Sequence, residues 1–198
     1  MDKVLCIGKN YLDHAKELGD AIPDKPVLFI KPPSSVLQIS KNTDPMHADL
    51  PQNRGQVHHE CEIVARLNAK AQITHVTLGL DMTLRDLQAQ QKKNGHPWEI
   101  AKVFKHAALI GPWIPIEIFK NYLDTEFELS IDQVVKQKSF GNKMRLSPQE
   151  CALYAAEFFP IVEGDVLMTG TPEGVGPVQE GQVARLKWAD KLDFSIRF

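Results

Sequence analysis

The chain has 198 residues, of which 43% are hydrophobic, a length that predicts one compact domain with an ordinary apolar core. Its 23 basic and 25 acidic side chains leave a formal charge of −2, so no broad basic face for nucleic acid is expected. No apolar run approaches the roughly 20 residues of a spanning helix, and the amino terminus lacks a secretory signal, which predicts a cytoplasmic protein that does not bind membranes. The cysteines Cys6, Cys61 and Cys151 lie far apart, which favours reduced, buried thiols over a disulfide framework.

Short apolar runs rich in Val and Ile predict a protein built largely of β-strands. Gly and Pro are scattered between these runs and are not pooled into a linker, and no internal repeat is present, so one domain over residues 1–198 with an antiparallel or mixed sheet is expected. The predicted strands are Val4–Ile7, Val27–Ile30, Val36–Ile39, Val57–Leu67, Ile73–Leu78, Phe127–Val135, Val166–Met168, Val183–Trp188 and Leu192–Phe198.

Helix signals are fewer than strand signals. A short polar helix is expected over Tyr11–Leu18. A second helix is predicted over about 84–93, with Thr83 as its N-cap and Gly95 as its C-terminal stop.

The helix with the clearest start is predicted over Pro148–Phe159. Ser147 is placed to cap its first turn, and Glu150 follows three residues later, which is the capping-box pattern. Pro148 at the first helical position fits the same interpretation, since its missing N–H is not needed there.

The strongest candidates for a functional site are three acidic residues. Glu60 and Glu62 are two residues apart in a β-like run, so their side chains project from one face while Cys61 projects from the other. Asp81 ends the next apolar strand. Carboxylate oxygens suit Mg²⁺, Mn²⁺ or Ca²⁺ better than zinc. A solvated polar face would show the same spacing, and Asp81 could instead cap the following helix.

His58 and His59 stand beside the first glutamate and raise the question of a zinc site. A deaminase needs a downstream Cys-x-x-Cys pair, and a zincin needs a second histidine four residues on; the sequence has neither. A structural role, or one supporting the carboxylates, is therefore expected for both histidines.

A loop rich in Gly and Pro over 170–177 follows the predicted strand Val166–Met168. Its backbone amides, together with the hydroxyl of Thr171, could hold a carboxylate or a phosphate. The loop lacks the ending of a Walker motif and the spacing of a Rossmann turn, which disfavours a nucleotide. A tight structural turn would have the same composition.

Basic and amide side chains provide possible partners for an anion. Lys102 lies in a mostly apolar stretch, where its ammonium should reach solvent or face an internal anion such as the carboxylates. Arg85 and Gln88 are three apart in the predicted helix, so they share one face; an exposed helix face is the ordinary alternative.

His14 and Glu17 are also three apart, within the expected helix Tyr11–Leu18. On one helix face they would form a hydrogen-bonded pair able to activate water. A solvated surface pair is the alternative.

Five strings of the sequence, in this order and spacing, together resemble the fumarylacetoacetate hydrolase family, and most closely its small single-domain members. They are Gly8-Lys9-Asn10-Tyr11 with His14, Lys31-Pro32-Pro33-Ser34, His59-Glu60-Cys61-Glu62, Gly79-Leu80-Asp81-Met82-Thr83-Leu84-Arg85-Asp86 and Gly170-Thr171-Pro172-Glu173-Gly174-Val175-Gly176. The resemblance covers nearly the whole chain. The segment Gln137–Leu146 departs from it, and the amino-terminal domain of larger relatives is missing.

The resemblance implies a β-rich α+β fold, a mixed β-roll or sandwich with short peripheral helices, normally as a homodimer. It further implies a Mg²⁺ or Mn²⁺ held by Glu60, Glu62 and Asp81. Substrate-binding residues would be Arg85, Gln88 and Thr171. Catalytic residues would be His14 and Glu17, in a lid segment over residues 1–20, together with Lys102.

The activity that the resemblance implies is metal-dependent cleavage of a carbon–carbon bond in a small 2-oxo acid. Hydrolysis of acylpyruvates, which are 2,4-dioxo acids, is the first expectation. Oxaloacetate decarboxylation or tautomerisation, or an isomerase or decarboxylase of aromatic catabolism, is the alternative. A non-catalytic binder of dicarboxylates is the remote one.

Overall fold

The computed structural model describes residues 1–11, 25–40 and 44–198. Its largest sheet has eight strands in the order β2-β1-β13-β6-β7-β9-β3, with β10 paired to β7. Most neighbours are antiparallel, whereas β1 with β13 and β3 with β9 are parallel, so the sheet is mixed as predicted. The strands are β1 (Val4–Gly8), β2 (Val27–Lys31), β3 (Val36–Gln38), β6 (Cys61–Leu67), β7 (Ile73–Asp81), β9 (Ala108–Ile110), β10 (Ile114–Pro115) and β13 (Val166–Met168).

Two smaller sheets complete the β-structure. The five-stranded sheet has the order β12-β11-β15-β16-β4, and the three-stranded sheet has the order β14-β5-β8. Their strands are β4 (Met46–His47), β5 (Val57–His59), β8 (Thr83–Leu84), β11 (Phe127–Ile131), β12 (Val134–Ser139), β14 (Gly176–Val178), β15 (Val183–Trp188) and β16 (Leu192–Arg197).

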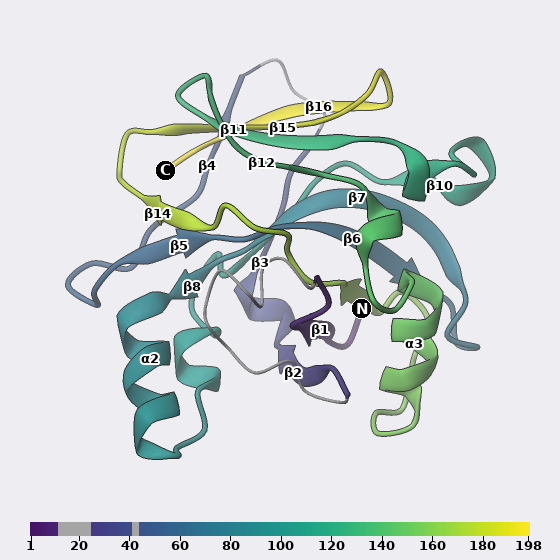
Figure 1. Ribbon diagram of the computed structural model, residues 1–198, viewed down its shortest axis with the longest axis horizontal. Coiled ribbons are helices and arrows are strands. Elements are labelled where there is room, and N and C mark those ends of the chain that lie inside the picture. Colours follow the sequence, from purple (N-terminus) through teal and green to yellow (C-terminus); the bar gives the residue numbers. More distant parts are fainter. Residues whose placement is uncertain (12–24, 41–43) are drawn as a thin grey trace.

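The helices are short and lie at the periphery. The five-stranded sheet stacks on β6 and β7, and the helices α2 (Arg85–Asn94) and α3 (Pro148–Ala156) flank β1 and β2 on the opposite side (Figure 1). Single 3-10 turns are η1 (Pro33–Ser35), η2 (Glu99–Ala101), η3 (Ile116–Ile118), η4 (Tyr122–Asp124) and η5 (Gly141–Lys143). This is the β-rich roll with peripheral helices that the sequence predicted.

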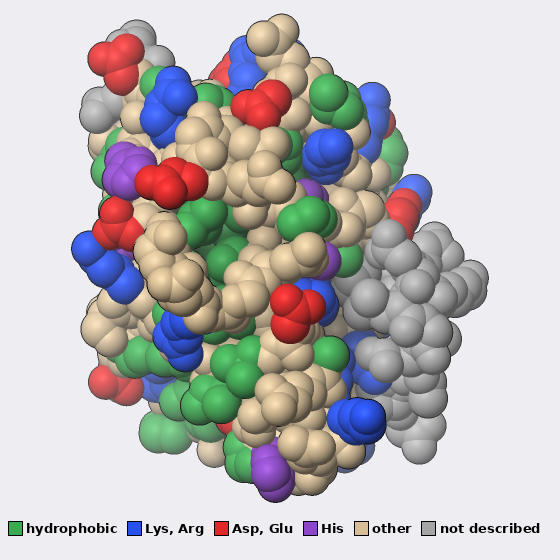
Figure 2. Space-filling model, turned by 90° about the vertical axis from the view of Figure 1, so that its left-hand side faces the viewer, with side chains coloured by type: hydrophobic (Ala, Val, Ile, Leu, Met, Phe, Trp, Pro, Cys, Tyr) green, Lys and Arg blue, Asp and Glu red, His purple; other side chains and the backbone are tan. Residues whose placement is uncertain are grey.

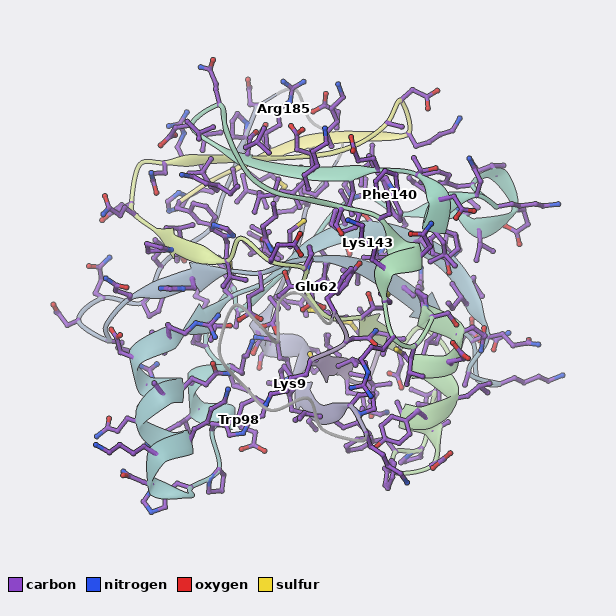
Figure 3. The ribbon with its side chains drawn as sticks, viewed as in Figure 1. Lys9, Glu62, Trp98, Phe140, Lys143 and Arg185 are labelled. Atoms are coloured by element: carbon purple, nitrogen blue, oxygen red, sulfur yellow. The ribbon has the colours of Figure 1, made fainter. Side chains whose placement is uncertain are left out.

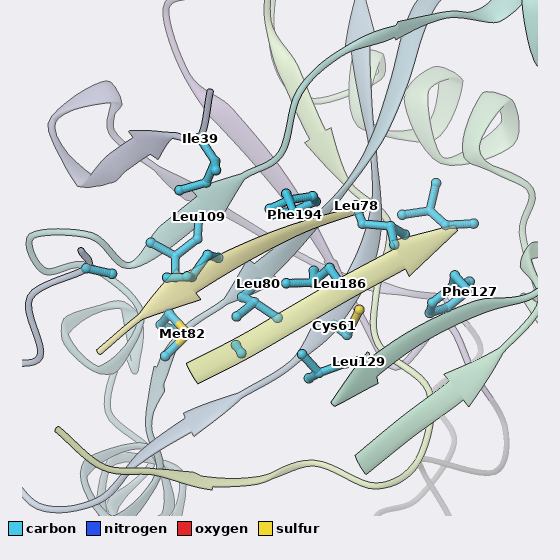
Figure 4. Close-up of a cluster of buried hydrophobic side chains, with 14 of the residues drawn as sticks. Ile39, Cys61, Leu78, Leu80, Met82, Leu109, Phe127, Leu129, Leu186 and Phe194 are labelled. Carbon is cyan, nitrogen blue, oxygen red and sulfur yellow. The ribbon is translucent and has the colours of Figure 1, made fainter. Parts of the chain in front are cut away.

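An apolar core fills the space between the five-stranded sheet and β6 and β7. Leu186 and Phe194 of the five-stranded sheet, called the upper sheet below, pack in one cluster with Cys61, Leu78 and Leu80 of the eight-stranded sheet (Figure 4). The opposite face of the upper sheet is solvated. The side chains there are paired on the surface, as Arg185 is with Asp193. The alternation of buried and exposed residues along β15 and β16 follows from the two-residue period of a strand.

Two predicted strands are interrupted in the structure. The prediction of one strand over 57–67 is wrong at Glu60, where the chain passes from β5 of the small sheet to β6 of the large one. The prediction of one strand over 127–135 is also wrong, because Asp132 and Gln133 adopt φ of 47° and 68° and form the tight turn between β11 and β12. Both turn residues have left-handed φ, as in the primed hairpin turns, but the usual glycine is absent.

The helix boundaries follow the predicted signals with two corrections. Thr83 is not an N-cap: Leu84 takes that position without a side-chain bond, and Thr83 Oγ1 instead donates to Glu60 Oε1 at 3.0 Å. Gly95 ends α2 in the left-handed conformation, with φ of 67°. The capping box of α3 is present as predicted, although the helix ends at Ala156 and not at residue 159.

Several short strands were not predicted, namely β4, β8, β9, β10 and β14. The expected helix over Tyr11–Leu18 lies largely outside the described residues, and Tyr11 itself forms an isolated bridge with Met144. Cys6, Cys61 and Cys151 are free and buried, in agreement with the expectation of reduced thiols.

Candidate active site

The antiparallel pairing of β6 with β7 brings the acidic residues together. The N–H of Asp81 donates to the carbonyl of Glu60 at 2.9 Å, and Glu62 lies opposite Gly79 in the same ladder. One carboxylate oxygen from each of Glu60, Glu62 and Asp81 lies within 4.8 Å of the others, and all three side chains are buried. The interpretation of these glutamates as a solvated strand face is therefore wrong, and Asp81 does not cap α2.

Buried cations surround the carboxylates. Lys102 Nζ lies 2.8 Å from Glu60 Oε2 and 2.8 Å from Asp81 Oδ2, so its ammonium faces an internal anion, one of the two placements expected for it. The Arg85 guanidinium pairs with Glu60 Oε1. Burial alone would lower the pKa of Lys102, but the charges of Asp81 and Glu60 outweigh it and raise that pKa.

Lys31 is a site residue to which the sequence reasoning gave no role. Its side chain is fully buried, and its ammonium lies 2.8 Å from Asp81 Oδ1. It donates to the carbonyls of Met82 at 3.3 Å, Ala107 at 3.0 Å and Lys102. These three carbonyls take the three protons of the ammonium. Lys31 therefore pairs with Asp81 Oδ1 through charge alone, and this oxygen receives no hydrogen bond from the described residues. A lysine at the end of the apolar strand β2, directly before two prolines, was the available signal.

The start of α2 directs its polar side chains at the same place. Arg85 Nη1 donates to Gln88 Oε1 at 2.8 Å, so the two side chains share one helix face as predicted. Gln88 is only 6% exposed, and both residues line the cavity described below. The exposed-face alternative does not hold for this pair.

The loop after β13 binds a carboxylate of the protein itself. The N–H of Gly170 donates to Glu62 Oε2 at 2.8 Å. Thr171 Oγ1 donates to the carbonyl of Cys61 at 2.8 Å and accepts from Gln137 Nε2 at 2.8 Å. The proton of the Thr171 hydroxyl is thus already used, and towards a ligand this oxygen acts as an acceptor.

The chemistry of this donor set fits a divalent cation. Burial, followed by the charges of Asp81 and Glu60, raises the pKa of Glu62 well above its ordinary value. Like charges this close repel one another, and a hard cation bound between the oxygens would offset that repulsion. The carboxylates offer only oxygen, which suits Mg²⁺ or Mn²⁺.

A cavity of about 290 Å³ opens beside the carboxylates. Glu62 lies near the centre of the molecule, and Lys9 and Trp98, which line the same cavity, lie between it and α2 (Figure 3). The wall of the cavity combines apolar, polar and charged residues, namely Ile7, Gly8, Lys9, Val27, Phe29, Glu60, Glu62, Asp81, Arg85, Gln88, Lys92, Trp98, Lys102 and Thr171. This is a volume suited to a small organic acid.

The two histidines beside Glu60, which are His58 and His59, lie outside the acidic group. His59 is buried, with Nδ1 3.0 Å from Gln137 Oε1, and burial lowers its pKa, so it is a neutral structural residue. His58 Nε2 lies 3.3 Å from Gln56 Oε1. Neither belongs to the acidic group, which agrees with the predicted structural role. His14 and Glu17 lie outside the described residues, so their pairing stays a prediction.

The surface offers two further observations. On the face drawn in Figure 2, Lys and Arg side chains are interspersed with Asp and Glu side chains. Within residues 1–11, 25–40 and 44–198, every helix is too short or too polar to cross a membrane.

The β-rich roll thus holds, beside a small cavity, a buried acidic group that could bind a metal ion. The family model described as fumarylacetoacetate (FAA) hydrolase C-terminal matches residues 3–197. The chain therefore belongs to the fumarylacetoacetate hydrolase family.

Named relatives cover most of the chain. The oxaloacetate tautomerase YcgM of Escherichia coli (strain K12) is 37% identical over 192 residues, 91% of this chain and 85% of that protein. The mitochondrial oxaloacetate decarboxylase of Dictyostelium discoideum is 35% identical over 193 residues, 92% and 87% of the two chains. The crystal structure of fumarylpyruvate hydrolase from Pseudomonas aeruginosa, in complex with Mn²⁺ and pyruvate, has a TM-score of 0.91 and 32% identity, covering 100% of this chain and 89% of that one. The chain is an enzyme, a hydrolase or a related lyase or isomerase.

Proposed function

We propose that this chain is a Mg²⁺- or Mn²⁺-dependent enzyme that forms or stabilises the enolate of a small 2-oxo acid, and that oxaloacetate tautomerisation is its leading reaction. The observation on which the proposal rests is the buried convergence of Glu60, Glu62 and Asp81 beside a cavity of about 290 Å³. Relatives named oxaloacetate tautomerase and oxaloacetate decarboxylase, at 35–37% identity, support this choice of substrate.

Glu60, Glu62 and Asp81 would hold the metal ion. When bound, Mg²⁺ or Mn²⁺ supplies Lewis-acid polarisation of the 2-oxo group and offsets the negative charge of the enolate. The ammonium of Lys102, 2.8 Å from two of the carboxylates, would donate to the oxygen on which that charge develops. Arg85 and Gln88 line the cavity and can bind the substrate's carboxylate.

Thr171 requires a different assignment from the one first expected. Its proton is donated to the Cys61 carbonyl, so it is suited to accept from a donor on the substrate, such as an enol hydroxyl, and not to hold a carboxylate. The tautomeric reaction itself moves one proton between carbon 3 and the oxygen on carbon 2. We assign His14 and Glu17, which lie outside the described residues, as the two side chains that together act as the general base for that proton.

Acylpyruvate hydrolysis is the second candidate. It is favoured by the likeness to the fumarylpyruvate hydrolase structure, at a TM-score of 0.91. In that reaction water adds to the carbonyl at carbon 4, and the bond between carbons 3 and 4 breaks to leave the enolate of pyruvate and a carboxylic acid. Decarboxylation of oxaloacetate breaks the corresponding bond without water. Isomerisation or decarboxylation of muconate-like acids, and binding of dicarboxylates without turnover, are weaker alternatives.

Product analysis separates these candidates. The enzyme would be incubated with enol and keto oxaloacetate, acylpyruvates, fumarylpyruvate and muconate-like acids, each with Mg²⁺, with Mn²⁺ and with EDTA. Loss of enol absorbance faster than the spontaneous rate, without CO₂ release, identifies the tautomerase. Release of pyruvate from acylpyruvates makes hydrolysis the main reaction. Binding without turnover on every substrate would contradict the proposal and leave the non-catalytic binder.

His14→Ala tests the assigned base. Because a positioned general base contributes about 10²–10⁴-fold, hydrolysis of an acylpyruvate should fall by that factor while Mg²⁺ affinity stays at the parental value. Decarboxylation uses no water nucleophile and should fall less. Parental hydrolysis in the variant would remove His14 from the mechanism, and lost metal binding would move it into the metal site.

The expected homodimer belongs to the same proposal and is supported by the resemblance to the small members of the family. Light scattering at micromolar protein concentration tests the homodimer; a monomer mass would contradict it. The cytoplasmic location stays a prediction from the sequence, and the Dictyostelium discoideum relative is a mitochondrial protein.

A further inference from the structure

Gln137 joins segments on both sides of the carboxylates, and it comes from the other layer of the fold. It lies on β12, the edge strand of the five-stranded sheet, whereas the glutamates lie at the start of β6 below it (Figure 1). Its side chain is nevertheless only 1% exposed. A polar side chain on an edge strand normally faces solvent, so its burial needs a local cause.

A β-bulge turns Gln137 inward. On β12, Val135 pairs with Ser130 and Gln137 pairs with Leu129, so Lys136 is the extra residue. Without the bulge Lys136 would lie opposite the buried Leu129, and Gln137 would be directed to the outer face. The loop after β13 packs against the bulge: a Cβ on Gly174 would lie 2.2 Å from the Lys136 carbonyl oxygen.

The amide of Gln137 satisfies groups on two chain segments at once. Its Oε1 accepts from the N–H of Cys61 at 2.9 Å and contacts His59 Nδ1 at 3.0 Å. Its Nε2 donates to Thr171 Oγ1 at 2.8 Å and to the carbonyl of Pro172 at 3.0 Å. This orientation of the amide is the only one that matches donors with acceptors on both sides, and it makes His59 the Nδ1–H tautomer.

The residues that Gln137 holds are the neighbours of the carboxylates. His59 and Cys61 stand on either side of Glu60, and Cys61 separates it from Glu62. The N–H of Cys61 is bound by Gln137, and its carbonyl is bound by Thr171, which Gln137 binds in turn. The backbone of Cys61, the residue between the two glutamates, is therefore bound at both its N–H and its carbonyl.

We propose that Gln137 is a positioning residue, which sets the spacing of the Glu60 and Glu62 carboxylates and orients Thr171 through one hydrogen-bonded network. The inference rests on the proposed metal site at these glutamates. Gln137 touches neither the cavity nor the proposed metal position, so it acts through His59, Cys61 and Thr171.

The test uses Gln137→Met, which keeps the length of the side chain and removes its hydrogen bonds. Removing a partner that orients metal ligands typically costs 10–100-fold in metal affinity or activity, so the Mg²⁺ dissociation constant, measured by calorimetry well below the melting temperature, should rise by about that factor. At saturating Mg²⁺, KM for the best substrate should also rise, because Thr171 is released.

The matched control is Gln149→Met. Gln149 also joins two backbone groups, accepting from Ile73 N–H at 3.3 Å and donating to the Ala71 carbonyl at 2.9 Å, on α3 and away from the carboxylates. This variant should lose thermal stability while retaining the Mg²⁺ affinity and KM of the parent.

Each outcome decides between named possibilities. A parent that binds no Mg²⁺ refutes the proposed function, and not this inference alone. A Gln137→Met variant with parental Mg²⁺ affinity and KM overturns the inference, whatever its melting temperature. If Gln137→Met does not fold, Gln137→Asn keeps the amide but shortens its reach: weakened Mg²⁺ binding supports the positioning role, and parental binding with a lower melting temperature refutes it.

Discussion

The two faces of the β6–β7 pair are both buried, yet they are built by different rules. On one face Cys61, Leu78 and Leu80 pack against the upper sheet in an apolar cluster. On the other face Glu62 and Asp81 lie beside Glu60, and the cations Lys31, Lys102 and Arg85 pair with Asp81 or Glu60. The same alternation of side chains along the strands produces both regions, because neighbouring residues project to opposite faces.

The difference lies in what each face requires of its neighbours. The apolar face needs filled volume, and many combinations of side chains achieve this. The charged face needs a particular partner for each charge, because a buried ion without one is costly. Lys31 and Lys102 meet this requirement by pairing with Asp81. Substitutions on the two faces should therefore fail in different ways.

Asp81→Asn should have the largest effect, because it removes a proposed metal ligand and the anion shared by Lys31 and Lys102. Loss of an outer partner alone costs about 10–100-fold, so Mg²⁺ affinity should fall by at least about 100-fold. Breaking a buried ion pair should also lower the free energy of unfolding by about 3–5 kcal/mol. Calorimetric titration and urea denaturation measure the two effects; unchanged Mg²⁺ binding would refute the assignment of Asp81.

Leu186→Ala should weaken the packing on the apolar face and leave the charged face unchanged. Leu186 is fully buried between the sheets, and its truncation leaves a cavity that should cost about 2–5 kcal/mol of stability. Mg²⁺ affinity should match the parent, since no charge has lost its partner. The control is Leu153→Ala on α3, where a 54% exposed leucine should change stability by about 0.5 kcal/mol or less. Weakened metal binding in Leu186→Ala would show that the two faces are coupled.

Asp165 sharpens the comparison, because it is a buried carboxylate outside the acidic site. It accepts from the N–H groups of Asp2 and Lys3 at 2.9 and 3.2 Å, from Val162 N–H at 3.0 Å and from Lys3 Nζ at 2.8 Å. Burial opposes ionisation, but these donors prevail and lower the pKa of Asp165, whereas burial, followed by the charges of Asp81 and Glu60, raises the pKa of Glu62.

Asp165→Asn should cost about 1.5–3 kcal/mol at neutral pH, the range for hydrogen bonds to a charged group. A lowered folded pKa stabilises the fold above the unfolded value of about 3.9, and the contribution is lost as pH falls through the folded pKa. The difference in melting temperature between parent and variant should therefore be steady from pH 8 to 5 and shrink below about pH 4. Mg²⁺ affinity should not change. A difference that grows in acid would contradict the assignment.

Features of the structure that depend on residues close together in the chain could be predicted from the sequence. The strand over Val183–Trp188 and the capping box at Ser147 depend on residues close together in the chain, and both appear as predicted. The convergence of Glu60, Glu62 and Asp81 also followed from strand geometry and a motif. Lys31 and Gln137 were missed, because their roles depend on segments far away in the chain. The turn at Asp132 was missed because it lacks the expected glycine.

The bulge at Lys136 also bears on how this family can diverge. If Lys136 entered the ladder opposite Leu129, the side chains of β12 beyond it would exchange their inner and outer faces, so Gln137 would leave the interior although no residue of the acidic site had changed. Aligned by letters, such a sequence would still contain every recognised motif. A shift of register on this edge strand is thus a route by which a descendant gene could retain the family's signature while losing the arrangement that the signature is taken to indicate.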